Sequence, residues 1–170
     1  MNTLRLPLRS ISHWAVLLLP VLLLAVLLLA ACAQGSAEIA PPEIRYGEDL
    51  CAHCNMIISE PRFAAGYARE LAPGRYESLA FDDIGDMLEA AKAHTDHTVV
   101  AWYVHDYTSE EWIDATTAHY VVSKAIITPM GFGIAAHSSQ EAAAAQAAEV
   151  QGEVLTWEEL QAHDTAHGMH

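Results

Sequence analysis

The chain has 170 residues, with 8 Lys and Arg against 22 Asp and Glu, and a formal net charge of −14 at pH 7. This acidic balance argues against a protein that binds nucleic acid or anionic lipid head groups, because both carry negative charge. The sequence also contains 10 His, 5 Met and 3 Cys, so ligands for a metal ion are available.

Residues 1–31 have the pattern of a lipoprotein signal peptide. Arg5 and Arg9 precede an unbroken apolar run, WAVLLLPVLLLAVLLLAA, and this order is typical of export signals. The run ends in LAAC, which resembles a bacterial lipobox in which Cys32 is lipidated and becomes the first mature residue. An uncleaved membrane anchor is the alternative, because the 14–31 run is nearly long enough to span a bilayer. Both interpretations place the remaining chain on the periplasmic side of a cell membrane.

Residues 32–44 are predicted to form a lipid-anchored tether. Small residues and the Pro41-Pro42 pair keep such a segment extended and semi-stiff. Ala33 follows the cysteine where Asp would signal retention in the inner membrane, so by analogy the outer membrane is favoured. The tether leads into a predicted folded domain over 45–160. A flexible tail containing His and Met follows over 161–170, since it lacks a core-forming pattern.

Strands and a helix follow one another in the first part of the domain. β-branched and aromatic residues, the Pro73-Gly74 turn and a helix cap at Asp82 or Asp83 define these elements. The predicted elements are a strand over 62–71, its partner over 75–81, a helix over 83–94 and a strand over 97–107.

The same order recurs in the second part of the domain. Strands are predicted over 111–123 and 131–138, a helix over 140–150 and a closing strand or short helix over 152–160. The segment Ala80-Phe81-Asp82-Asp83 aligns with Ala136-His137-Ser138-Ser139 at an offset of 56 residues. Ser138 and Glu141 have the spacing of a capping box for the second helix. The sequence therefore predicts an α+β fold of two repeated ββαβ units, about 45–107 and 108–160.

The segment CAHCNM, which begins at Cys51, contains the most informative group of potential ligands. A c-type haem site needs His directly after the second Cys, but Asn55 stands there. A structural zinc site needs about four ligands, and no second Cys or His pair at matching spacing occurs in the folded region. A disulfide across so short a loop would add little stability. A thiol–disulfide oxidoreductase using Cys51 and Cys54 stays open as an alternative, although Pro61 prevents a long helix from following the pair.

Cysteine and methionine together indicate a softer metal. Thiolate and thioether sulfur favour Cu(I) over zinc, magnesium or calcium. Cys54 and Met56 lie two positions apart, so both point to one side if the segment is extended. Asn55 between them accepts a positive φ more readily than most residues, so the segment can equally bend around an ion. Met130 occupies a second candidate position, on a turn between Pro129 and Gly131.

Four segments in this order resemble the NosL family of copper-binding accessory lipoproteins. They are CAHCNM, LAFDDIGDM, VHDYTSEEWIDATTAHYVVSK and TPMGFGIAAH. The resemblance covers roughly residues 45–160 and extends to the lipobox. It implies a periplasmic Cu(I) metallochaperone with two ββαβ units, which supplies copper for the maturation of nitrous oxide reductase in denitrification. It also implies partners, namely the NosDFY-type ABC transporter complex and NosZ, the nitrous oxide reductase itself.

The resemblance carries particular residues over to this chain. Cys54, Met56 and Met130 match the family's metal ligands, and Cys51 and His137 are additional candidates. No nucleophile–base pair, phosphate-binding loop or suitably spaced carboxylate pair is present in the sequence, so we expect a carrier rather than an enzyme.

Overall fold

The computed structural model describes residues 39–163. These residues all belong to one unit of the chain, Ala37–His170. The predicted signal peptide, Cys32, Ala33 and the tail beyond 163 lie outside the described residues. Within 39–163, no helix has the length and apolar character needed to cross a membrane.

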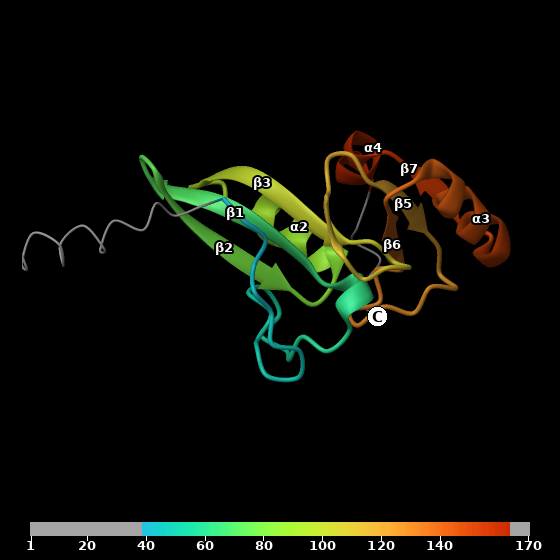
Figure 1. Ribbon diagram of the computed structural model, residues 1–170, viewed down its shortest axis with the longest axis horizontal. Helices are drawn as coiled ribbons and strands as arrows, with labels where there is room; N and C mark the ends of the chain where they lie inside the picture. Colours follow the sequence, from blue (N-terminus) through green and yellow to red (C-terminus); the bar gives the residue numbers. More distant parts are fainter. Residues whose placement is uncertain (1–38, 164–170) are drawn as a thin grey trace, which may run out of the picture. The chain divides into compact units, whose positions relative to one another are not determined.

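The first sheet has four antiparallel strands in the order β2-β1-β3-β4. A 3-10 turn, η1, precedes β1, and the helix α2 packs against β1 and β2 (Figure 1). The elements are η1 (Pro61–Phe63), β1 (Ala65–Ala72), β2 (Arg75–Phe81), α2 (Ile84–Ala93), β3 (Thr98–His105) and β4 (Trp112–Asp114).

The second sheet has three antiparallel strands in the order β6-β5-β7, and α3 packs against all three. The elements are β5 (His119–Val122), β6 (Ile134–His137), α3 (Gln140–Val150), β7 (Glu153–Leu155) and α4 (Trp157–Ala162). In both sheets the first strand of a ββαβ unit lies between the second and the last. The predicted α+β fold with two repeated ββαβ units is therefore confirmed.

One predicted strand is in fact two. The segment 111–123 divides into β4 and β5, which belong to different sheets. The Asp114 side chain accepts hydrogen bonds from the backbone N–H (2.8 Å) and hydroxyl (2.7 Å) of Thr116, which forms a local turn and ends β4. The closing segment contains both predicted elements, because β7 is followed directly by α4. Thr156 and Glu159 form a reciprocal capping box at that helix.

The helix caps follow the predicted repeat. Asp83 caps α2 and Ser139 caps α3, which keeps the offset of 56 residues. The capping box predicted at Ser138 is wrong. Ser139 accepts the hydrogen bond from the Ala142 N–H instead, while the Ser138 N–H donates to Asp106.

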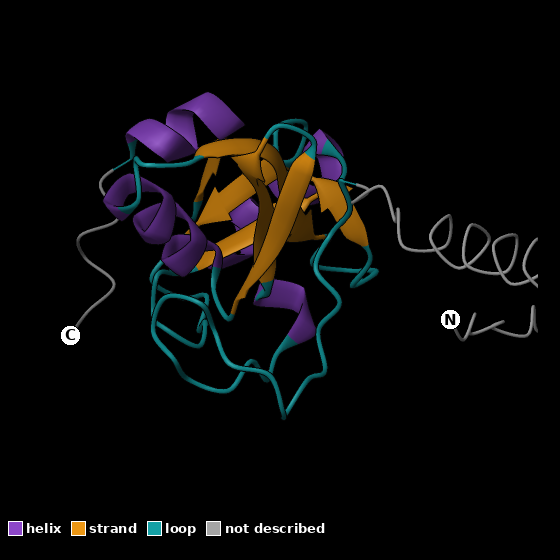
Figure 2. Ribbon diagram, turned by 90° about the vertical axis from the view of Figure 1, so that its left-hand side faces the viewer, coloured by secondary structure: helices purple, strands orange, loops and turns teal. Residues whose placement is uncertain are grey.

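A shared core joins the two units. One cluster of buried side chains includes Phe81 and Met87 from the first unit and Tyr120 and Leu160 from the second. Figure 2 shows long loops gathered at one end of the strands, around the short η1 turn. The candidate ligands predicted in the Cys51–Met56 segment and at Met130 lie in such loops.

The Asp106 carboxylate links the two units at this end. It accepts hydrogen bonds from the backbone N–H groups of Thr108 (3.0 Å), Ser109 (2.9 Å) and Ser138 (2.7 Å). Burial disfavours the charge of Asp106, but these hydrogen bonds outweigh burial and hold the pKa of the carboxyl well below its usual range.

Asp106→Asn is expected to lower the free energy of unfolding at neutral pH by about 2 kcal/mol, because an amide replaces charge-assisted acceptors with one neutral acceptor. The depressed pKa makes the Asp106 contribution complete above the unfolded-state pKa of about 4, and progressively smaller as the pH falls below it. Urea unfolding at neutral and acidic pH measures both stabilities. We expect the gap between wild type and variant to narrow in acid; a gap independent of pH would contradict this role.

Candidate metal centre

The Cys51–Met56 segment forms a tight turn that closes a short hairpin. Leu50 and Ile57 pair as an antiparallel bridge, and the Cys51 N–H donates to the Met56 carbonyl at 2.8 Å. The Asn55 N–H donates to the Cys51 carbonyl at 3.0 Å, and Asn55 has a φ of 61°. The segment is therefore bent rather than extended, and Asn55 has the positive φ that makes the bend.

The turn places its two cysteines differently. Cys51 is 2 % exposed, whereas Cys54 is half-buried. Both are free thiols, and the Cys51 thiol donates to Asp86 Oδ2 at 3.2 Å. The two sulfur atoms and a carboxylate oxygen of Asp86 lie within 4.8 Å of one another. Burial and the hydrogen bond to Asp86 raise the pKa of the Cys54 thiol.

Asp86 is the residue that the sequence did not identify as part of this cluster. It lies in the first turn of α2, where its charge suits the helix N-terminus. The sequence showed this helical role, but no ligand-like spacing relates Asp86 to cysteines more than 30 positions earlier. Only the packing of the Cys51–Met56 turn against α2 brings them together.

The loop that contains Met130 is fixed to the same end of α2. The buried Asp83 carboxylate accepts hydrogen bonds from the Thr128 hydroxyl (2.5 Å), the Met130 N–H (3.1 Å) and the Gly85 N–H (3.1 Å). Burial raises the pKa of Asp83, although these three hydrogen bonds oppose the shift. Gly131 follows with a φ of 78°, as a turn requires.

The first turn of α2 therefore meets both predicted ligand segments. Asp83 contacts the Met130 backbone, and Asp86, three residues later, contacts Cys51. The Met130 residue is partly buried, while Met56 is 54 % exposed. Two segments of the sequence that lie far apart thus reach one helix end, where sulfur ligands from both are available.

His137 lies elsewhere in the second unit. It is 2 % exposed, its Nε2 contacts Gln146 Oε1 at 2.7 Å, and its ring lies 5.7 Å from that of Tyr107. Its Nδ1 has no hydrogen-bond partner within residues 39–163. Among these residues, His137 does not belong to a group of three or more Cys, His, Asp or Glu ligands. A metal-binding role for His137 stays a prediction.

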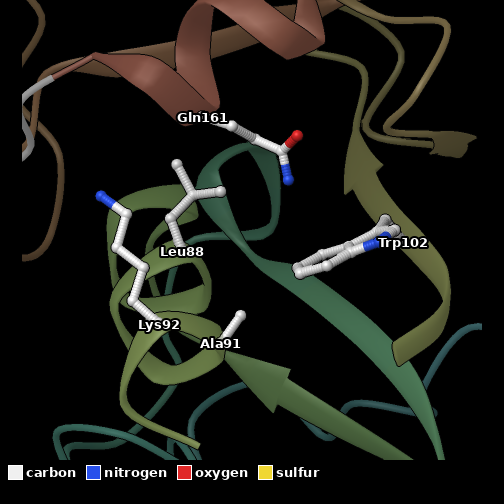
Figure 3. A pocket seen from close by; sticks show the side chains of 5 residues that line it. All are labelled: Leu88, Ala91, Lys92, Trp102 and Gln161. Atoms are coloured by element: carbon white, nitrogen blue, oxygen red, sulfur yellow. The ribbon is translucent and has the colours of Figure 1, made fainter. Parts of the chain in front are cut away.

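A small pocket beside α2 is separate from these residues. It has a volume of about 240 Å³, and Figure 3 shows side chains from α2, β3 and α4 around it. Its lining residues are Leu88, Ala91, Lys92, Trp102 and Gln161. None is a predicted ligand, so the sulfur chemistry is not in this pocket.

Together these features define a class of protein: a small α+β domain of two ββαβ units with a cysteine-containing turn packed against a helix N-terminus. The comparison with protein families identifies the particular one. The NosL family model matches residues 44–165, which is most of the chain, so the chain belongs to the NosL family.

A solved structure shares the fold. The chain is similar to the crystal structure of the copper chaperone NosL from Shewanella denitrificans, with a TM-score of 0.62 and 21% sequence identity. The match covers 72% of this chain and 96% of that chain. The search of curated proteins found no match.

Proposed function

We propose that this protein is a membrane-anchored Cu(I) carrier on the periplasmic side of the cell, which supplies copper for the maturation of nitrous oxide reductase. The observation that carries the proposal is the meeting of the Cys51–Met56 turn and the Met130 loop at the first turn of α2. Membership of the NosL family and the fold shared with a copper chaperone support it.

The ligands in this proposal are the Cys54 thiolate and the thioethers of Met56 and Met130. Soft sulfur ligands stabilise Cu(I) over harder ions. Because the pKa of Cys54 is raised by burial and by Asp86, Cu(I) must displace the thiol proton when it binds. Met56 is more than half exposed, so a partner's ligands can approach the ion from that side.

The delivery partners come from the family resemblance. A NosDFY-type transporter complex receives the copper, and NosZ is the final client. Lipidation at Cys32 keeps the carrier at the membrane, favouring the outer membrane. Neutral thioethers supply two of the three proposed ligands, which suits an ion that has to leave again.

Thiol–disulfide exchange is less well supported. The thiolate is the nucleophile in such exchange, and catalytic cysteines have a lowered pKa. Here burial and the Asp86 carboxylate raise the pKa of Cys54 instead. The Cys51–Cys54 pair also lies in a turn rather than at the start of its own helix.

An anaerobic titration of the reduced protein with Cu(I), in competition with a chromophoric chelator, tests the proposal. We expect one Cu(I) per chain for the wild type. Cys54→Ser and Met130→Leu should each weaken binding about tenfold or more, equivalent to at least about 1.4 kcal/mol. Leu retains the apolar character of Met130 but removes the sulfur, so it separates ligation from packing. A wild type that cannot compete, or variants that bind as tightly as the wild type, would refute the carrier function.

A further inference from the structure

Asp86 is a buried carboxylate with unusual partners. It is 2 % exposed, and the groups that approach it are the thiols of Cys51 and Cys54. Asp82 and Asp83 nearby are also buried. Within residues 39–163, no Lys, Arg or His forms an ion pair with any of these three carboxylates. Buried charges are normally paired with an opposite charge or bound to a metal ion.

The dimensions of the cluster fit one metal ion. The Cys51 and Cys54 sulfur atoms and an Asp86 oxygen lie within 4.8 Å of one another. Zinc binds sulfur at about 2.3 Å and carboxylate oxygen at about 2.0–2.2 Å, so two ligand atoms on one ion are at most about 4.6 Å apart. Small side-chain movements therefore suffice to bring all three atoms onto a common ion.

The chemistry of these donors differs from that of the carrier site. Two thiolates and one carboxylate carry three negative charges, and the oxygen is a hard ligand. A divalent ion of intermediate softness fits this set better than Cu(I) does. Zinc accepts Cys and Asp ligands together, and water can fill its fourth position.

We propose that Cys51, Cys54 and Asp86 form a second metal position that binds Zn²⁺ and shares Cys54 with the Cu(I) site. Each cysteine releases its proton to solvent when Zn–S bonds form, and no electron is transferred. Because one sulfur serves both positions, Zn²⁺ and Cu(I) exclude each other. Only this competition rests on the proposed carrier function; the zinc position itself does not.

The position assigns a role to Cys51, which the carrier site does not require. Cys51 is held by Asp86 on the buried side of the turn, whereas Met56 is on the exposed side. Cys54 lies between them in the sequence and can therefore contribute to either set. The turn then offers a buried, charged set of ligands and a more open sulfur set.

Metal titrations of the reduced, full-length chain in detergent test the proposal. Cd²⁺ serves as a spectroscopic probe, since its charge-transfer absorption reports thiolate ligands and not histidines of the C-terminal segment. Zn²⁺ affinity is then measured against a chromophoric chelator. We expect one strong Cd²⁺ band in the wild type, and Zn²⁺ binding about tenfold or more weaker in Cys51→Ser and in Asp86→Asn. Met130→Leu is the matched control, expected to bind Zn²⁺ as the wild type does.

The Cu(I) titration of the same variants separates the two proposals. Asp86→Asn should retain Cu(I) binding, while Met130→Leu should lose it. Zinc binding without Cu(I) binding would refute the carrier function and leave the zinc position intact. Absence of a Cd²⁺ band in the wild type, or wild-type Zn²⁺ affinity in both Cys51→Ser and Asp86→Asn, would overturn the zinc position. Thermal unfolding confirms that each variant is folded before its affinity is compared.

Discussion

Asp83→Ala is expected to lower the free energy of unfolding by about 3 kcal/mol, because it removes a helix cap and leaves buried donors without an acceptor. The Asp83 carboxylate is fully buried and accepts hydrogen bonds from the Thr128 hydroxyl and from the N–H groups of Met130 and Gly85. Alanine can replace none of these contacts. Urea unfolding followed by circular dichroism measures the loss.

The repeat provides a matched control for this substitution. Ser139 caps α3 at the equivalent position, but its side chain is exposed and accepts only from the Ala142 N–H. Ser139→Ala removes the cap alone and is expected to cost about 1 kcal/mol. Equal losses in the two variants would show that the Thr128 and Met130 contacts contribute nothing to stability.

Asp83→Ala should also weaken Cu(I) binding if Met130 is a ligand, because the Met130 backbone would lose its anchor. The change in Cu(I) affinity is measured at a temperature where the variant remains folded. Ser139→Ala again serves as the control and should bind Cu(I) as the wild type does. A folded Asp83→Ala protein with wild-type Cu(I) affinity would contradict the positioning role of Asp83.

Gly85→Ala is the second substitution with a large expected effect. A Cβ at Gly85 would lie 2.0 Å from Cγ of the Phe132 ring, so the ring and its loop have to move. Overpacking of this kind costs about 2 kcal/mol, despite the better helix propensity of alanine. Since Phe132 lies two residues from Met130, we also expect Cu(I) affinity to fall.

A double-mutant cycle with Phe132→Ala checks the reason for this effect. Once the ring is absent, the added methyl group meets no obstacle at that place, and alanine in a helix is favoured over glycine by about 1 kcal/mol. Gly85→Ala should therefore become neutral or stabilising in the Phe132→Ala background. The same loss in both backgrounds would assign the effect to something other than contact with Phe132.

Much of the fold could be predicted from the sequence, because local patterns determine it. The caps at Asp83 and Ser139 were found from polar residues placed before apolar helical patterns, and their equal spacing revealed the repeat. The break between β4 and β5 was missed, because 111–123 has a continuous strand composition. The side chain of Asp114, by bonding to Thr116, makes the turn within that composition.

The site was predictable only in part. Cys54, Met56 and Met130 were proposed from the chemistry of sulfur and from a family resemblance, and their role as ligands remains a prediction. Asp86 could not be related to the cysteines, because helix packing and not sequence spacing brings them together. Likewise, Asp83 showed its capping role in the sequence but gave no sign that it accepts hydrogen bonds from Thr128 and Met130.

The hydrogen bonds to Asp83 have a consequence for the order of folding during synthesis. The ribosome completes the first unit while Thr128 and Met130, more than 40 residues further on, have not yet emerged. Until then, the carboxylate that becomes fully buried lacks two of its three donors and remains stable only in contact with water. The N-terminal half of the domain is thus unfinished when it emerges, and its native core closes only after the second half has arrived.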